Sequence, residues 1–232
     1  MDKEKSWITR NKYNLLYYLG GFFLLGFAVN LGKASRLGNG AWDTVTINIR
    51  DYFLNVHNYT WITLGMVSFT ISMILMLIVM IYRRKIKYLT MLIPIGLIAI
   101  SIDFWNIFVF QDQTSSTFEI QLLFYISAAL LLPLGLTMVV KSGFPAFVYD
   151  ELMLMFVKVF KAKKITWVRL GIEMTGILIG VIFGYLVYIH FFNEGHLGAV
   201  NVGSFILAFT LSPVMAYYYK VLKIPKEKDS EI

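Results

Sequence analysis

The residues of this chain that could do chemistry are a few ionisable side chains set in strongly apolar sequence. Arg169 and Glu173 lie four positions apart inside the apolar stretch 165–191, so a helix places them on one face, where they can pair. A charge near the centre of a bilayer costs at least roughly 2.5–3.5 kcal/mol on insertion scales and is retained mainly for structure or transport. We therefore expect either a buried ion pair that fixes helix packing or a binding site for a substrate or coupling ion.

Four further polar residues are candidates for the same binding site. Asp43 and Asp150 each lie in a short segment that glycine or proline residues separate from the longer apolar stretches. Asp103 lies near the end of another apolar stretch and could instead reach water. Asn201, in the last stretch, could instead form a hydrogen bond between helices. The three histidines are isolated and the chain has no cysteine, so the sequence predicts no metal site and no cofactor.

The sequence lacks the motifs that mark common enzyme classes. It contains no Gly-x4-Gly-Lys-(Ser/Thr) loop for ATP, and no His-Glu-x-x-His or Gly-x-Ser-x-Gly motif. We therefore expect no enzymatic activity. No stretch is polar and long enough to form a soluble domain, so nucleic acid is not an expected partner.

The composition indicates which class of protein positions these residues. Of the residues, 58% are hydrophobic and only 15% are charged, which is more apolar sequence than a soluble domain of this size can bury. A membrane-spanning helix needs about 20 mostly apolar residues. Six stretches qualify, at 13–32, 59–82, 88–110, 118–140, 165–191 and 197–219. We predict an all-α polytopic helix bundle in the lipid bilayer, a single integral membrane domain over 1–232 with short cytoplasmic tails.

The basic residues predict the orientation of these spans. With the N-terminus inside, the four cytoplasmic segments hold 4, 4, 5 and 4 lysines and arginines, which is 17 of the 21 in the chain. The outer segments hold three, and Arg169 lies within a span. This asymmetry follows the positive-inside rule, so both termini are expected in the cytoplasm.

The two halves of the sequence repeat one pattern. TWITLG at 60–65 begins 17 residues after Asp43, and TWVRLG at 166–171 begins 16 residues after Asp150. Each half contains three spans, and an odd number inverts the second half in the membrane relative to the first. We predict an inverted 3+3 repeat, with repeat 1 at about 13–110 and repeat 2 at about 118–219. The alternative is a chance similarity between apolar sequences.

Each half also carries a short helix that does not span, expected at 41–56 and 144–160. Helical spacing in the first puts Trp42, Val45, Ile49, Tyr52, Phe53 and Val56 on an apolar face and Asp43, Thr46 and Arg50 toward another. This pattern fits an amphipathic helix in the membrane interface or half of a re-entrant hairpin. The inverted repeat puts the two short helices on opposite sides of the membrane. Trp42, Trp61 and Trp167 are expected to serve as gate or interface anchors.

Three glycines predict a packing surface on the fifth span. Gly176, Gly180 and Gly184 recur every four residues, and such a stripe of small residues lets another helix approach closely. The stripe continues the face of Arg169 and Glu173, so this face is expected to point into the bundle. The same stripe could instead serve a homodimer contact.

Several segments together resemble a known family. They are GKASRLGNGAWDTV and YTWITLG in the first half, and KSGFPAFVYDELML, ITWVRLGIEMTGILIGVIFG and LGAVNVGSFILAFTLSPVM in the second. From about residue 13 to 219 the chain resembles the YczE/YitT-like group of bacterial multi-spanning membrane proteins. The resemblance implies the fold and a location in the bacterial plasma membrane. That group is largely uncharacterised, so the resemblance implies no catalytic residue.

Three functions fit these predictions. The first is a small secondary transporter or exporter of a small molecule, in which Asp43 and Asp150 line opposite vestibules while Arg169 and Glu173 bind the substrate or a coupling cation. The second is an accessory protein that assists assembly or export by a partner membrane protein. The third is the substrate-binding membrane subunit of a multi-chain importer. A transporter predicts a polar cavity between the halves, whereas an accessory protein predicts a packed bundle.

Overall fold

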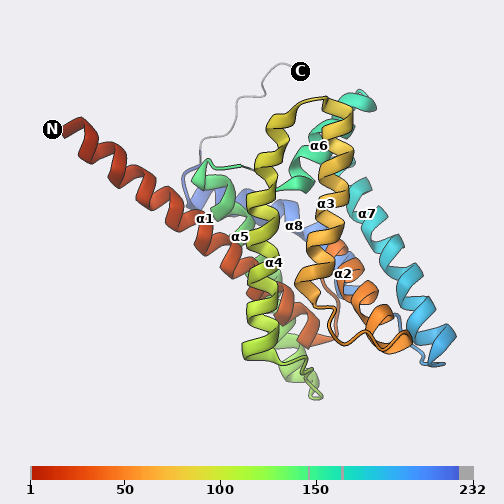
Figure 1. Cartoon of the computed structure of the whole chain (residues 1–232). Helices are drawn as coiled ribbons and strands as arrows, with labels where there is room; N and C mark the ends of the chain where they lie inside the picture. Colours follow the sequence, from red (N-terminus) through yellow and green to blue (C-terminus); the bar gives the residue numbers. More distant parts are fainter. Residues whose placement is uncertain (1, 146, 163–164, 225–232) are drawn as a thin grey trace.

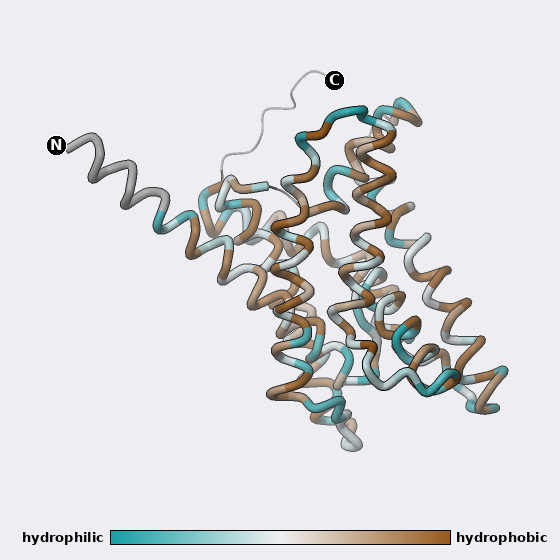
Figure 2. Tube along the Cα trace, viewed as in Figure 1, coloured by the Kyte–Doolittle hydropathy of each residue, from teal (hydrophilic) through white to brown (hydrophobic). Residues whose placement is uncertain are grey.

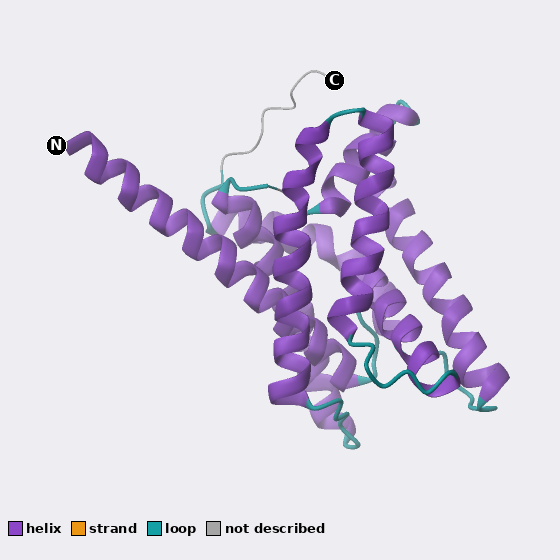
Figure 3. Cartoon of the chain, in the orientation of Figure 1, coloured by secondary structure: helices purple, strands orange, loops and turns teal. Residues whose placement is uncertain are grey.

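The computed structural model describes the chain at residues 2–145, 147–162 and 165–224, with side chains from Lys12 onward. Within these ranges the chain is helical and contains no β-strand, only one β-bridge between Leu197 and Val200 (Figure 3). The α-helices are α1 (Asp2–Ser35), α2 (Ala41–Asp51), α3 (Leu64–Arg83), α4 (Leu92–Trp105), α5 (Phe118–Ser142), α6 (Val148–Val159), α7 (Ile165–Gly184) and α8 (Val202–Val221). Short 3-10 or π segments adjoin them: η1 (Tyr52–Val56) after α2, η2 (Ile86–Met91) before α4, η3 (Asn106–Phe110) after α4 and η4 (Tyr185–Phe191) after α7.

Six helical stretches of the described chain are long and apolar enough to cross a membrane. They are Lys12–Ser35, Leu64–Arg83, Ile86–Phe110, Phe118–Ser142, Ile165–Phe191 and Val202–Val221. Apolar residues run along these stretches and polar residues gather at their ends (Figure 2). Large apolar side chains such as Ile81, Ile100 and Leu178 are exposed on their outward faces, as a surface in contact with lipid requires. The predicted all-α, multi-pass membrane bundle is confirmed.

Two of the spans begin later than predicted, because polar side chains cap them. The second span begins at Leu64 and not at 59, since the Thr63 side chain accepts a hydrogen bond from the Met66 backbone N–H at 3.1 Å. The sixth begins at Val202 and not at 197, where Asn201 and Ser204 form a capping box. Trp61, which the prediction placed inside the second span, therefore precedes its helix, whereas Trp167 lies in the first turn of α7.

The centre of the bundle is the crossing of α1 and α5. A side-chain Cβ at Gly21 would lie 2.9 Å from the carbonyl oxygen of Gly135, so glycine lets the two backbones approach closely. Buried apolar residues of both helices, including Phe22 and Leu132, pack around this crossing. The helix α4 packs on α1, where the Asn30 side chain donates to the Ile102 carbonyl at 3.0 Å.

The short helices α2 and α6 lie toward opposite ends of the bundle (Figure 1). The helix α6 lies where α3 ends and α7 begins, and α2 lies in the half of the bundle where α3 begins and α7 ends. We call these the α6 end and the α2 end. The helix α1 begins, and α8 ends, toward the α6 end.

The predicted apolar and polar faces of α2 are wrong. Its buried residues are Ala41, Thr44, Val45, Thr46, Ile47, Asn48 and Asp51, so polar side chains point inward. They do so because the helix packs against α3, α7 and α8, where Asn48 donates to the carbonyls of Gly180 at 2.9 Å and Leu197 at 3.0 Å. The helix α2 is thus enclosed by the bundle and does not lie on its surface.

Candidate functional site

A cavity lies where all eight α-helices meet, with a volume of about 110 Å³. Each of the eight contributes at least one residue to its wall. The lining residues are Leu25, Val29, Gly40, Ala41, Trp42, Asp43, Thr46, Ser68, Ile98, Leu132, Leu136, Phe147, Tyr149, Asp150, Arg169, Glu173 and Leu211. We call this space the central cavity.

The central cavity brings together four of the six predicted binding residues: Asp43, Asp150, Arg169 and Glu173. Asp43 lies in the first turn of α2 and Asp150 in the first turn of α6. The N-terminus of a helix carries a partial positive charge that favours acidic side chains, so each short helix stabilises its own aspartate. Arg169 and Glu173 come from one face of α7, four residues apart.

The charged groups of the central cavity are not paired with one another. The ion pair between Arg169 and Glu173, one of the two expected alternatives, is absent. Within the described chain no carboxylate oxygen lies within 4.0 Å of an Arg169 nitrogen. Its guanidinium instead lies 3.2 Å from the Met215 sulfur. Four ionisable side chains therefore line the void with the capacity to bind something else.

Burial changes the proton affinity of the two aspartates. Burial, with a further contribution from the nearby charge of Glu173, raises the pKa of Asp43 from its usual value to about 7. Burial also raises the pKa of Asp150, but Arg169 opposes this shift while Glu151 adds to it. Asp43 can therefore gain or lose a proton near neutral pH.

Aromatic rings form one wall of the central cavity. The ring centroids of Trp42 and Tyr149 are 5.2 Å apart, and those of Phe147 and Tyr149 are 5.3 Å apart. The Trp42 indole N–H is buried and has no hydrogen-bond partner among the described residues, which leaves a donor free for a ligand or a water molecule.

Many of the lining residues occur as pairs at one interval in the sequence. Asp43 and Asp150 are 107 residues apart (150 minus 43). The same interval separates Trp42 from Tyr149, Gly40 from Phe147, Leu25 from Leu132 and Val29 from Leu136. The wall of the cavity is thus built largely from residue pairs that share one interval in the sequence.

The other two predicted binding residues lie outside the central cavity and cap helices. Asp103 accepts hydrogen bonds from the Thr63 hydroxyl and the Gly65 backbone N–H, both at 2.6 Å, and so holds the start of α3 against α4. Asn201 is the N-cap of α8 and donates to the Arg36 carbonyl at 3.0 Å. Neither residue reaches the four charged groups.

The predicted anchors and packing residues lie in three places. Trp61 and Trp167 are each 68% exposed, at the start of or just before a span, whereas Trp42 lines the central cavity. The stripe of Gly176, Gly180 and Gly184 receives α2 of the same chain, because a Cβ at these positions would touch Ala41, Thr44 and Asn48 in turn.

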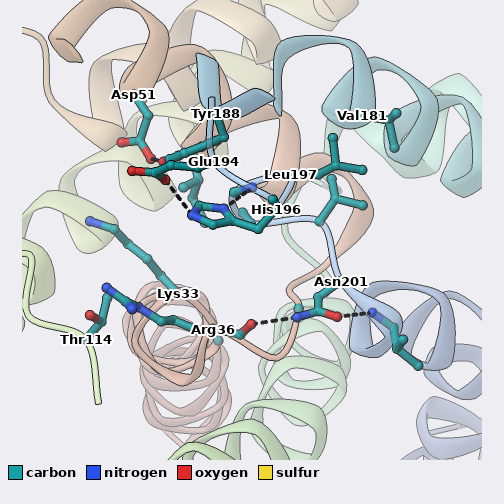
Figure 4. A pocket seen from close by; sticks show the side chains of 18 of the residues that line it. Lys33, Arg36, Asp51, Thr114, Val181, Tyr188, Glu194, His196, Leu197 and Asn201 are labelled. Carbon is teal, nitrogen blue, oxygen red and sulfur yellow. Dashed lines mark hydrogen bonds and ion pairs between the residues drawn. The ribbon is translucent and has the colours of Figure 1, made fainter. Parts of the chain in front are cut away.

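A larger pocket of about 840 Å³ opens at the α2 end (Figure 4). Lys33 and Arg36 of α1 and its following loop face Tyr188, Glu194 and His196 across it. Here Asn201 donates to Arg36, and His196 pairs with Glu194 at 2.7 Å. The sequence predicted only Asn201 of these lining residues.

A network of charges crosses the α2 end beside this pocket. Asp112 pairs with both Lys33 and Arg50, and Arg50 also pairs with Asp51 at 3.2 Å. The Tyr188 hydroxyl donates to Asp51 at 2.5 Å. Burial alone would raise the pKa of Asp112, but Lys33 and Arg50 outweigh it and lower the pKa. The charged residues Lys33, Arg50, Asp51 and Asp112, in otherwise weakly charged segments between spans, were the available signal for this network.

No group of three or more histidine, aspartate or glutamate side chains suited to a metal ion occurs in the described ranges. The guanidinium group of Arg169 lies among the acidic groups of the central cavity. Its positive charge makes the cavity a poor site for a divalent metal ion.

A family model matches residues 12–220 of the chain, and its description is "Family of unknown function (DUF6198)". No curated protein and no solved structure matches the chain. The match agrees with the expected uncharacterised family, while the YczE/YitT-like assignment stays a prediction. Since the matched region covers the six spans except for the last residue of the sixth, the chain belongs to this family of unknown function, DUF6198.

Proposed function

We propose that this membrane protein is a small secondary transporter whose substrate site is the central cavity. The observation that carries the proposal is the wall of the cavity, where five pairs of residues 107 positions apart, including Asp43 and Asp150, surround unpaired charges. A site at the meeting of two related halves is the arrangement by which such halves rock around a bound solute.

The packing of the helices supports an inverted repeat with α1 to α4 equivalent to α5 to α8. The helix α1 packs on α4 as α5 packs on α8, and α2 packs on α7 as α6 packs on α3. Two further contacts correspond in the same way. The contact between α2 and α3 has its counterpart between α6 and α7, and the contact between α3 and α4 has its counterpart between α7 and α8. The pairing of α1 with α5 joins equivalent helices, which is expected for helices beside a pseudo-two-fold axis.

Local hydrogen bonds at the ends of α1 and α5 support the same equivalence. The Ser35 hydroxyl donates to the carbonyl three residues earlier at 2.6 Å and accepts from the N–H two residues later at 3.2 Å. The Ser142 hydroxyl makes the same two bonds, at 2.6 and 3.2 Å. These serines are also 107 residues apart (142 minus 35).

We further propose that the α6 end faces the cytoplasm of a bacterial cell and the α2 end faces outward. The basic cluster Arg83, Arg84, Lys85 and Lys87 joins α3 to α4 at the α6 end, which accords with the positive-inside rule. The central cavity then opens alternately to the two sides as the halves move.

Alternating access can be tested on a chain that has no cysteine of its own. Ser68→Cys places one thiol on α3 in the wall of the central cavity. In oriented vesicles we expect a membrane-impermeant thiol reagent to modify it from either face. Conditions that raise the rate from one face should lower the rate from the other.

Thr70→Cys is the matched control, because Thr70 lies two residues further along α3 and is exposed on the outside of the bundle. It should show no such reciprocal change. Modification of the Ser68→Cys thiol from one face only, or rates that rise and fall together, would reject the transporter and favour an accessory protein or an importer subunit.

A further inference from the structure

The charges of the central cavity do not balance. Three carboxylates, those of Asp43, Asp150 and Glu173, line it beside the single guanidinium of Arg169, and the other lining residues are uncharged or phenolic. With these four groups ionised, the cavity carries a net negative charge. A positively charged occupant is therefore favoured by Coulomb attraction in this poorly screened interior.

The imbalance is concentrated beside α2. Arg169 opposes the burial of charge at Asp150, whereas the side chain acting on Asp43 is another acid, Glu173. Arg169 acts on Glu173 as well, so Asp43 is the carboxylate of the three that lacks this compensation. The space beside Asp43 is therefore where a cation gains most.

The aromatic wall suits the same kind of occupant. Trp42 directly precedes Asp43, and Tyr149 directly precedes Asp150, so each carboxylate is accompanied by a ring from its own helix. Aromatic faces attract ammonium groups, by about 0.5–1 kcal/mol when exposed and about 2 kcal/mol when desolvated. Rings together with carboxylates select an organic cation over a bare metal ion.

The size of the cavity limits the occupant. A water molecule needs roughly 10–15 Å³ of this kind of volume, and the cavity has about 110 Å³. It therefore accommodates a molecule of on the order of ten non-hydrogen atoms or fewer.

Resting on the proposed transport function, we propose that the central cavity binds a small organic cation, an amine or quaternary ammonium, which displaces a proton from Asp43. The cation lies against the Trp42 ring and between the carboxylates. The displaced proton leaves to water on the side to which the cavity is open. The only covalent bond that breaks is the O–H bond of the protonated Asp43 carboxyl group. One positive charge replaces another in the cavity, so the cation and the proton cross the membrane in opposite directions.

The electrostatic surroundings of Asp43 support this exchange. Facing it are Glu173 and Arg169 from α7, and Asp150 and Tyr149 from α6, while α1, α3, α4, α5 and α8 present uncharged side chains. Burial and Glu173 raise the pKa of Asp43 to about 7. The proton and the cation therefore compete near neutral pH, and a deprotonated Asp43 binds the cation better.

Calorimetric titration of the purified full-length protein tests the proposal with tetramethylammonium and ethylammonium as probes. We expect both to bind, with affinity rising about tenfold from pH 6 to pH 8, as linkage to one group of pKa near 7 requires. Comparing buffers of different ionisation enthalpy should reveal proton release on binding. Neutral tert-butanol, similar in shape to tetramethylammonium, and acetate should not bind.

Two matched substitutions locate the site. Glu173→Gln should weaken binding at least tenfold, whereas Glu119→Gln, at an exposed acid at the start of α5, should leave it unchanged. Asp43→Asn should abolish the proton release and the pH dependence. If tetramethylammonium binds without proton release, or if glycine binds and the cations do not, the proposed substrate class is wrong.

The cation-binding experiment and the thiol-labelling experiment can fail independently of each other. Alternating reactivity at Ser68→Cys without cation binding would leave a transporter of another substrate class. Cation binding without alternating reactivity would leave a cation site in a protein that does not transport.

Discussion

The short helices α2 and α6 follow the first span of each half, yet the bundle holds them differently. The helix α2 is buried along most of its length and packs on three glycines of α7. The helix α6 buries Val148, Leu152, Met155 and Val157, while Leu154 and Phe160 beside them are 40% and 69% exposed. One short helix is enclosed and the other is held on one side.

The polar contacts at the two ends differ in the same way. At the α2 end Asp112 joins Lys33 to Arg50, whereas the ion pair that holds α6 within the described chain is Arg83–Glu151, with an N–O distance of 3.6 Å. Within the described residues, more ion pairs therefore hold the α2 end than the α6 end. In the proposed cycle, an opening at the α6 end breaks fewer contacts.

The largest expected effect separates the two aspartates at the helix starts. Because the folded-state pKa of Asp43 is raised to about 7 from a usual value of 3.8, the free energy of unfolding falls as pH rises between these values. The difference corresponds to roughly 4 kcal/mol as an upper bound at pH 8. Asp43→Asn removes this pH-dependent loss of stability. The variant should therefore be more stable than the parent at pH 8, and its gain in the free energy of unfolding at pH 5 should be less than half of the gain at pH 8.

Asp150→Asn is the comparison for this measurement. Arg169 offsets part of the burial of the Asp150 charge, so its replacement should stabilise the protein at pH 8 by less than Asp43→Asn does. Thermal unfolding midpoints of the purified variants at the two pH values measure both. A gain at Asp150 that equals or exceeds the gain at Asp43 would contradict the uneven charge compensation.

A second prediction concerns the tight contact between α2 and α7. In Gly180→Ala the new Cβ lies 2.6 Å from the Thr44 hydroxyl oxygen and 3.0 Å from Val200, so we expect a loss of about 1–3 kcal/mol from overpacking. Gly171→Ala, on the same helix toward the α6 end, meets no atom within 4 Å. It should gain roughly 0.5–1 kcal/mol, because alanine favours the helix.

Unfolding midpoints at one pH decide between these outcomes. If Gly180→Ala were as stable as Gly171→Ala, the close packing of α2 would not contribute to the seal at the α2 end.

The features that the sequence predicted correctly are those encoded in local patterns. Apolar runs of spanning length predict the six spans. The cost of charge in apolar sequence made Arg169 and Glu173 candidates for a binding site; both line the central cavity, and their binding role stays a prediction. The expectation that Asp43 and Asp150 line opposite vestibules is wrong, because both carboxylates lie in one cavity.

The features that were missed depend on tertiary contacts. The buried polar face of α2 depends on the carbonyls of Gly180 and Leu197, which accept from Asn48 across about 130 to 150 residues of chain, so helical periodicity gave the wrong face. The charge network at the α2 end joins Lys33 to Asp112 across 79 residues. The ion pair between Arg169 and Glu173, one of two expected alternatives, does not form, because helical spacing brings two side chains within reach without fixing which way they point.

The smallest expected effect compares the ion pairs at the two ends. Asp112→Asn removes the acid that joins Lys33 and Arg50, and we expect a cost of about 1 kcal/mol, since Asp112 is partly exposed and solvent screens its charge. Because these partners lower the folded-state pKa of Asp112, its contribution is present above the unfolded pKa, near 4, and is lost as pH falls through the folded value. Glu151→Gln, which removes the longer Arg83 contact, should cost less than about 0.5 kcal/mol.

The same pair of variants also reports on access to the central cavity. Combined with Ser68→Cys, Asp112→Asn should raise the rate of thiol modification from the α2 face, because it weakens the contacts that seal this end. Glu151→Gln should leave the rate from the α2 face unchanged and raise the rate from the α6 face slightly. If both substitutions changed stability and access equally, the two ends would be held equally firmly and the difference between α2 and α6 would be one of packing alone.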